Sequence, residues 1–113
     1  MRGDAAWQAI QSANQFNDTA PEGMEYLLVK IHAKCTYADS EEHSIGGSDF
    51  KVTGDRLVMY HQAYVVDPEP GLDGQLYAGG ETEGWVSFAV GQGEGNLILI
   101  VDELMNWDSD RFR

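Results

Sequence analysis

The sequence predicts an all-β protein, an antiparallel β-sandwich of about seven strands. The first observation is the segment 25–37, where apolar residues occupy the odd positions from Leu27 to Cys35 and polar residues stand between most of them. A period of two is typical of a strand that buries one face and leaves the other wet. The second observation is that Gly, Pro, Asn and Asp recur between apolar runs, at intervals that suit a sandwich.

The first segment, residues 4–17, fits two patterns. Apolar residues at positions 7, 10 and 13 have the spacing of a helix, whereas Trp7, Ala9 and Gln11 would share one face of a strand. The β character of the rest of the chain favours extended structure here. Residues 17–23 are rich in turn formers and include a proline, so we expect a loop.

Two strands joined by a tight turn are expected in the middle of the chain. Residues 49–53 alternate between polar and apolar and predict the first strand. Gly54-Asp55 suits a two-residue hairpin turn, because glycine accepts positive φ. Residues 56–66 predict the returning strand. Its apolar residues fall on both faces, so it is either central or bent.

The second half begins with the clearest break in the chain, at the prolines and glycine of residues 67–71. Residues 82–90 predict a strand whose even positions from 84 to 90 share one face. Residues 91–95 alternate glycine with polar residues and predict a flexible loop. They lack the lysine of a phosphate-binding loop. Residues 97–101 are wholly apolar and predict the most buried strand.

Composition predicts one domain, residues 1–113, with loosely ordered ends at 1–6 and 103–113. The 19 acidic and 7 basic residues give a net charge of −12. Such a field repels nucleic-acid phosphates and anionic membrane surfaces, so nucleic acid is not expected as a partner. No apolar run is long enough for a transmembrane segment. The single cysteine, Cys35, cannot form a disulfide within the chain, and its place in the pattern predicts a buried side chain.

Two blocks of the sequence resemble a known family. The residues that carry the resemblance are Trp7, Ile10, Phe16-Asn17 and Glu22-Gly23-Met24-Glu25-Tyr26-Leu27, then Leu72, Leu76-Tyr77-Ala78-Gly79-Gly80 and Gly84-Trp85-Val86-Ser87-Phe88-Ala89-Val90. Together they resemble the bacterial and archaeal immunoglobulin-like domain of unknown function that is found in secreted proteins and lipoproteins. That domain is similar in fold to the mycobacterial immunoprotective extracellular antigen, and some members carry the misleading name telomeric repeat-binding factor. The resemblance implies an immunoglobulin-like β-sandwich, an extracytoplasmic location with an export signal outside this chain, and no shared catalytic residues.

A basic stripe stands on the wet face of the first long strand. It consists of Lys30, His32 and Lys34, in a chain that is otherwise acidic. One interpretation is a surface that contacts an anion or an acidic partner. The other, which we favour, is cross-strand pairing with acids such as Glu81 or Glu83 on a neighbouring strand.

Aromatic residues are also candidate contacts. Trp85 alternates out of phase with Val86 and Phe88, so it should point away from the main core. It is then either an exposed contact residue or covered by the C-terminal tail, and both interpretations stay open. Tyr64 is a further candidate. We expect loops and an exposed sheet face to make the contacts, through Trp85, Tyr64 and the basic stripe.

Calcium is the metal that the acidic residues suit best, whereas zinc would need closely spaced His or Cys ligands that the sequence does not offer. Asp39, Glu41 and Glu42 cluster in one loop, and hard cations take carboxylate oxygens as ligands. The spacing is not that of an EF-hand, and charge runs are usually solvated faces. We therefore expect no cofactor and keep calcium as an alternative.

Three histidines, His32, His43 and His61, are the available bases, and no nucleophile-elbow pattern accompanies them. We therefore expect no enzyme. The leading hypothesis is a non-catalytic binding or adaptor domain outside the cytoplasm, with a protein or a cell-envelope component as its partner. The alternative is a calcium-stabilised structural domain of a secreted protein or lipoprotein. A third hypothesis is a hydrolase in which a pocket joins His61 to a carboxylate. Formation of a homodimer is left open.

Overall fold

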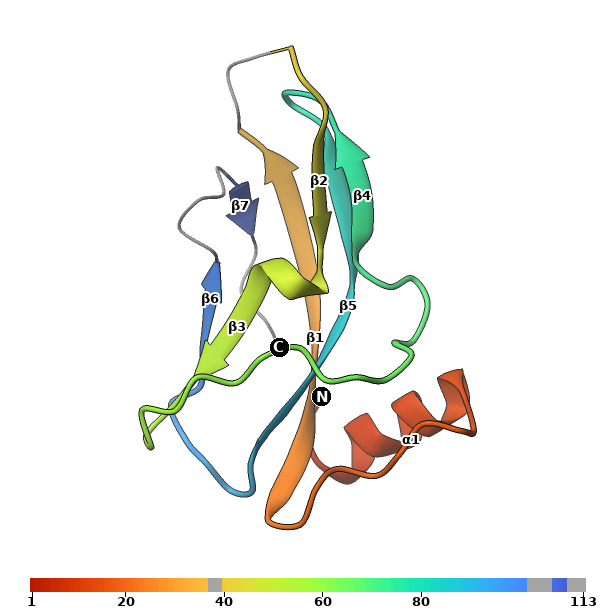
Figure 1. Ribbon diagram of the computed structural model, residues 1–113, viewed down its shortest axis with the longest axis vertical. Coiled ribbons are helices and arrows are strands. Elements are labelled where there is room, and N and C mark those ends of the chain that lie inside the picture. The colour runs from red at the N-terminus through yellow and green to blue at the C-terminus, as the bar shows by residue number, and fades with distance from the viewer. Residues whose placement is uncertain (37–39, 102–106, 110–113) are drawn as a thin grey trace.

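The computed structural model describes residues 1–36, 40–101 and 107–109, and over these residues the protein is predominantly β (Figure 1). The elements are α1 Asp4–Ala13, β1 Met24–Cys35, β2 His43–Gly46, the short 3₁₀ helix η1 Gly47–Asp49, β3 Phe50–Thr53, β4 Asp73–Leu76, β5 Glu81–Gly91, β6 Ile98–Val101 and β7 Trp107–Ser109. These strands pair antiparallel in sheets of order β5-β1-β7, β2-β4 and β3-β6. The predicted all-β class is confirmed at this level.

The long pair β1–β5 forms the centre of the molecule (Figure 1). Its register runs from Met24 opposite Gly91 to Lys34 opposite Glu81. Apolar residues therefore face each other across the ladder, as Leu27 and Phe88 do, and such cross-strand pairs stabilise a sheet. Both strands lie where the alternation of the sequence predicts them.

One face of β1–β5 packs against β2, β3 and β4, and the main core lies between these layers. Its buried members come from the odd positions of β1, from the even positions of β5 and from the inward-facing positions of the covering strands. They include Leu27, Val29, Ile31, Ala33, Cys35, Ile45, Phe50, Val52, Val86, Phe88 and Val90. Each buried Val, Leu, Ile or Phe side chain among them contributes about 1.5–3 kcal/mol through burial. Cys35 is buried, as its place in the pattern predicts.

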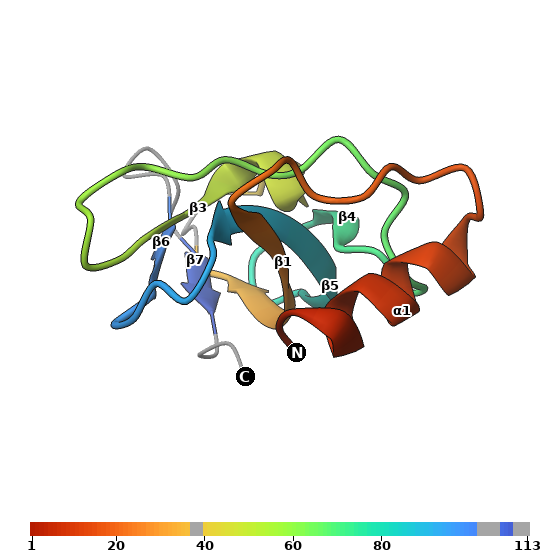
Figure 2. The ribbon, with the colours of Figure 1, turned by 90° about the horizontal axis from the view of Figure 1, so that it is seen from below.

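The opposite face of β1–β5 is covered near the start of β1 by helix α1 (Figure 2). The extended structure expected for this segment is therefore wrong. Ala6 and Ile10 lie one turn apart on a single helix face, and they pack against Tyr26 and Leu28. Because these two strand residues are also buried, β1 begins with both faces covered and alternates between buried and exposed only farther along. The sheet thus supplies the apolar surface that decides between the two patterns.

Residues 56–66 do not form the returning strand that the sequence predicts. A turn closes after β3, where the Leu57 amide donates to the Gly54 carbonyl at 2.9 Å, and only isolated bridges follow. The chain then crosses to the free edge of β5, and we call residues 60–72 the edge connection. Tyr60 packs in the main core, whereas Ala63 and Val65 pack on the helix side. The apolar residues fall on both faces because the segment contacts both cores in turn.

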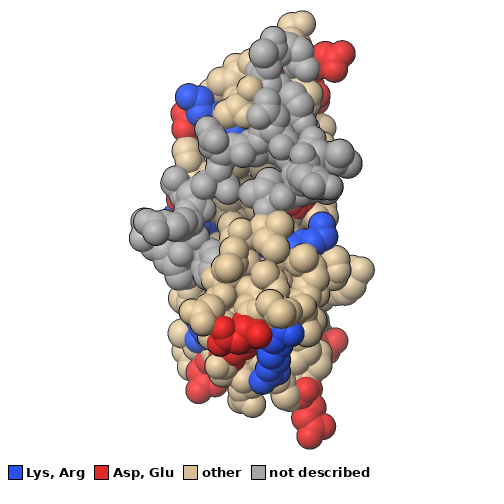
Figure 3. Space-filling model, turned by 90° about the vertical axis from the view of Figure 1, so that its left-hand side faces the viewer, with Lys and Arg blue, Asp and Glu red and all other residues tan. Residues whose placement is uncertain are grey.

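The apolar run 97–101 is not the most buried strand, and that prediction is wrong. Ile98 is 59% exposed, and Leu99 and Ile100 are half-buried. Among the described strands β6 pairs with β3 alone, so it lies at the margin of the molecule. Leu99 still packs against the main core. Figure 3 views the side of β3 and β6, where uncharged residues cover much of the surface that is not drawn in grey.

The N-terminal residues are bonded to β1. The Met1 ammonium donates to the Leu28 carbonyl at 2.9 Å, and Arg2 bridges to Leu27. At the other end, the backbone of 107–109 pairs with Ala33–Cys35, while 103–106 and 110–113 lie outside the described residues. Within the described part of the chain, no helix has the length and apolar character needed to cross a bilayer.

The packing of α1 predicts a large loss of stability when its buried contact is shortened. Ile10→Ala should lower the free energy of unfolding by about 3 kcal/mol, because it removes buried methyl groups and leaves a cavity. The exposed neighbour Gln11 is the control, and Gln11→Ala should change stability by less than about 0.5 kcal/mol. Urea unfolding followed by tryptophan fluorescence measures both. Equal effects would contradict the helix packing.

Candidate functional site

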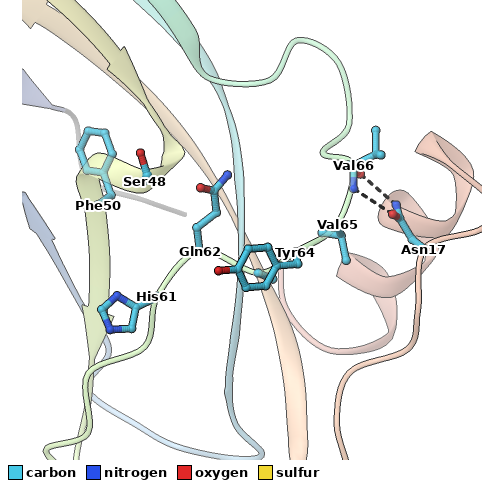
Figure 4. Close-up of a pocket in the computed structure, with 9 residues that line it drawn as sticks. Asn17, Ser48, Phe50, His61, Gln62, Tyr64, Val65 and Val66 are labelled. Atoms are coloured by element: carbon cyan, nitrogen blue, oxygen red, sulfur yellow. Dashed lines mark hydrogen bonds between the residues drawn. The ribbon is translucent and has the colours of Figure 1, made fainter.

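A hollow of about 590 Å³ lies between the η1–β3 segment and the edge connection (Figure 4). We call it the Tyr64 hollow. Its lining residues are Asn17, Ser48, Phe50, His61, Gln62, Ala63, Tyr64, Val65 and Val66. Most of them belong to one stretch of the edge connection, so the shape of the hollow depends on what holds that stretch in place.

The side chain of Asn17 holds one end of this stretch. Its Nδ2 donates to the Val66 carbonyl at 2.9 Å and to the Ile10 carbonyl at 3.0 Å, and its Oδ1 accepts from the Val66 amide at 2.8 Å. The side-chain amide thus pairs with Val66 as a neighbouring strand would, and it joins the edge connection to the end of α1 (Figure 4). Such bonds each contribute about 0.5–1.5 kcal/mol net.

A second anchor lies on β5. The hydroxyl of Ser87, which is fully buried, donates to Asp67 Oδ1 at 2.6 Å, and the Ser87 carbonyl accepts from the Ala63 amide at 2.8 Å. Burial raises the pKa of the Asp67 carboxyl, and the hydrogen bond from Ser87 acts in the opposite direction. The edge connection is therefore fixed on both sides of Tyr64.

Between these anchors, Tyr64 is fully exposed, with a relative accessibility of 105%. Val66 is 51% exposed, and Phe16, next to Asn17 in the chain, is 83% exposed. Exposed aromatic residues on a rigid support are typical of contact surfaces, because binding then costs little conformational entropy. Tyr64 was a candidate from sequence, whereas Asn17 was expected only as a turn residue.

The lining of the Tyr64 hollow combines apolar and polar groups. His61 and Ser48 both line it, but none of the described lining residues is Asp or Glu. A histidine acting as a general base is usually oriented by a third, acidic group. The lining instead offers apolar carbon, a phenol, an imidazole and amide groups, which are suited to hydrogen bonding and packing against a ligand.

The basic stripe lies elsewhere, on the exposed half of the sheet face that α1 partly covers. Lys30 Nζ is 3.1 Å from Glu83 Oε1, and His32 Nε2 is 2.9 Å from Glu81 Oε1. Lys34 stands opposite Glu81 in the register. The favoured cross-strand pairing is thus present. Because these groups are well exposed, such pairs contribute only about 0–1 kcal/mol.

Trp85 shares this face and is half-buried against the helix-side core. Lys30 Nζ lies 5.8 Å from the centroid of its ring, within the range of a cation–π contact. Trp85 therefore points away from the main core, as its phase predicts. The tail side chains that would cover it lie outside the described residues. Neither Trp85 nor the stripe lines the Tyr64 hollow, so the structure separates Tyr64 from the other four candidates.

The candidate calcium ligands are only partly described. Asp39 lies outside the described residues, and the side chains of Glu41 and Glu42 are exposed. Across the described part of the chain, no three His, Cys, Asp or Glu side chains are grouped so that they could hold a metal ion.

Glu94 is a buried structural carboxylate that the sequence did not predict. Glu94 is 4% exposed and joins the 91–95 loop to the turn after β3. Its Oε2 accepts from the Arg56 amide at 3.0 Å, and its Oε1 accepts a short hydrogen bond from the Tyr60 hydroxyl. The hydrogen bond from the Tyr60 hydroxyl is the main cause that lowers the pKa of Glu94, and the bond from the Arg56 amide lowers it further. The bond between Tyr60 and Glu94 also raises the pKa of Tyr60. The carboxylate acts as an internal acceptor that fixes two loops.

Comparisons of the chain with the models of known protein families, with curated proteins and with solved structures gave no match. The resemblance to the extracytoplasmic immunoglobulin-like domain therefore stays a prediction.

The bonds of Asn17 predict a local effect on the edge connection. Asn17→Ala should lower the free energy of unfolding by about 1–3 kcal/mol, since it removes three hydrogen bonds. The Val66 amide should also exchange its hydrogen faster, because it loses its acceptor. Amide exchange followed by NMR measures this, with Gln15→Ala as an exposed control. Unchanged protection at Val66 would show that Asn17 does not hold the segment.

The depressed pKa of Glu94 predicts a pH dependence with a definite sign. Ionised Glu94 stabilises the fold above the unfolded pKa of about 4.3, and this contribution is lost as the pH falls through the lower folded pKa. Glu94→Gln should therefore be less stable than wild type at pH 7, and the difference should shrink as the pH falls from about 5 to 3. Urea unfolding across this range measures it.

The difference in stability between Glu94→Gln and wild type reports on Glu94 alone. The raised pKa of Asp67 changes stability with pH in the opposite sense, but Asp67 is present in both proteins. Glu22→Gln, at an exposed position, serves as the charge-matched control. A stability difference that stays constant with pH would contradict the role of the ionised Glu94 carboxylate.

Proposed function

We propose that the protein is a non-catalytic binding module whose main contact residue is Tyr64, at the Tyr64 hollow. The single observation that carries the proposal is a fully exposed tyrosine on a segment that is fixed on both sides. A folded domain gains nothing in stability from an aromatic ring that contacts only water. Tyrosine is among the residues most enriched at the energetic centres of interfaces.

The hollow beside Tyr64 supports the same proposal. Its volume of about 590 Å³ lies in the usual range of ligand sites, and its lining mixes apolar carbon with a few polar groups. The hydrogen bonds from Asn17 and Ser87 hold the segment before a partner arrives, so little ordering would remain to be done on binding.

The partner we propose is a protein or another cell-envelope component. The net charge of −12 favours cationic or neutral partners over nucleic acid, whose phosphates it would repel. The resemblance stated from sequence supports an extracytoplasmic location. It also supports an immunoglobulin-like topology of about seven strands. The packing of β2, β3 and β4 on one face of β1–β5 is compatible with such a sandwich, while α1 on the other face is an addition to it.

A peptide-display experiment tests the role of Tyr64. Peptides selected on the wild-type protein should bind Tyr64→Ala at least about tenfold more weakly, because loss of a central aromatic contact commonly costs more than 1.4 kcal/mol. The melting temperature should stay unchanged, since the ring contacts solvent. Biolayer interferometry gives the affinities and calorimetry gives the melting temperatures.

Tyr77 provides a matched control, because it is also an exposed tyrosine and does not line the hollow. Tyr77→Ala should bind the selected peptides as wild type does. If Tyr64→Ala also binds them with wild-type affinity, the proposed contact surface is wrong. A large fall in melting temperature for Tyr64→Ala would instead place the ring in the packed structure.

A further inference from the structure

A second hollow, of about 420 Å³, lies beside the first turn of α1 and the start of β1. We call it the Trp7 hollow. Its lining residues are Gly3, Asp4, Trp7, Thr19, Ala20, Met24, Glu25, Tyr26 and Gln92. Two of these lining residues, Trp7 and Tyr26, are aromatic. The centroids of Trp7 and Tyr26 are 6.0 Å apart, and their planes are inclined by 21°, so the rings stack.

The aromatic residues of the Trp7 hollow have a fixed position. The hydroxyl of Tyr26 donates to the Asp18 carbonyl at 2.7 Å, and its ring packs with Leu28 and Ile10 in the helix-side core. Trp7 is half-buried, so part of its indole remains accessible from the hollow. Indole is the aromatic group that attracts cations best, because its π face carries negative charge.

Carboxylates outnumber cationic side chains around the Trp7 hollow. Asp4 and Glu25 line it, and no described lining residue is Lys, Arg or His. Glu25 is partly neutralised by Arg2, whose Nε lies 3.3 Å from Glu25 Oε1. Asp4 is exposed, and the negative charge of Asp18 lies close enough to help raise the pKa of Tyr26. The hollow therefore combines an aromatic surface with an excess of negative charge.

We infer that the Trp7 hollow binds an organic ammonium group, either a free quaternary ammonium or the side chain of a lysine in a partner. Cation–π attraction requires a cation within about 6 Å of the ring, and nearby carboxylates add Coulombic attraction. The same chain contains such a pair, because Lys30 lies above Trp85. Anions are disfavoured by Asp4 and Glu25. This site is separate from the Tyr64 hollow, with which it shares no lining residue.

NMR titration of the whole protein tests the inference, with the indole N–H of Trp7 as the reporter. Choline chloride and N-acetyl-lysine methylamide should each move this signal saturably, with a Kd on the order of 1–10 mM. The tighter of the two distinguishes a free quaternary ammonium from a lysine side chain. Ionic strength is held constant with sodium chloride. The neutral alcohol 3,3-dimethyl-1-butanol, which has the shape of choline without its charge, should not produce the shift.

Two variants assign the site. Asp4→Asn should raise the Kd for choline about fivefold, because it removes one nearby charge and leaves Trp7 in place. Asp73→Asn, an equal change of charge at an exposed position on β4, should leave the Kd unchanged. The inference fails if the neutral alcohol shifts the Trp7 signal as choline does, or if no saturable shift appears up to about 100 mM. Equal Kd values for the two variants would also overturn it.

Discussion

The pairing of β1 with β5 is the constraint on which the rest of the structure depends. One face of this ladder is covered by β2, β3 and β4, and near the start of β1 the other face is covered by α1. Toward the end of β1, one of these faces becomes exposed and carries the ion pairs of Lys30 and His32. Every hollow described above lies where a covering element meets this ladder or its free edge.

The free edge of β5 is closed by an irregular segment instead of a strand. Isolated bridges and side-chain bonds replace a regular ladder along the edge connection, at Gln62, Ala63 and Leu72. An edge strand with unpaired backbone groups is a site for aggregation, and covering it in this way removes that hazard. The same irregularity directs Tyr64 outward, because the segment has no strand register that would turn alternate side chains inward.

Local alternation was sufficient to predict β1, β5, the buried Cys35 and the cross-strand partners of the basic stripe. These features depend on a period of two, which can be read from adjacent residues. The helix could not be predicted in the same way. The helical spacing of positions 7, 10 and 13 is no clearer than the strand spacing of positions 7, 9 and 11. What decides the matter is the apolar surface of Tyr26 and Leu28, which lies outside the segment and is brought against it by the tertiary fold.

The run 97–101 shows that hydrophobicity alone does not measure burial. It is the longest apolar stretch near the end of the chain, yet β6 lies at the margin, where Ile98 faces solvent. The Tyr64 hollow was beyond local reasoning for a related cause. Asn17 and Val66 are 49 residues apart, and nothing in either neighbourhood indicates that they bond. Tyr64 was named as a candidate contact, but the bonds that hold its segment in place could not be predicted from its neighbours in the chain.

The position of Asn17 has a consequence for producing the protein in a eukaryotic host. Asn17-Asp18-Thr19 matches the acceptor pattern for N-linked sugars, which are attached to the side-chain nitrogen. In the folded protein that nitrogen already donates to two backbone carbonyls, between α1 and the edge connection. A glycan there would occupy the space of these bonds, so the modified chain and the native arrangement exclude each other. Material from a secretory host would consist of an unmodified folded form and a glycosylated form in which this junction is open.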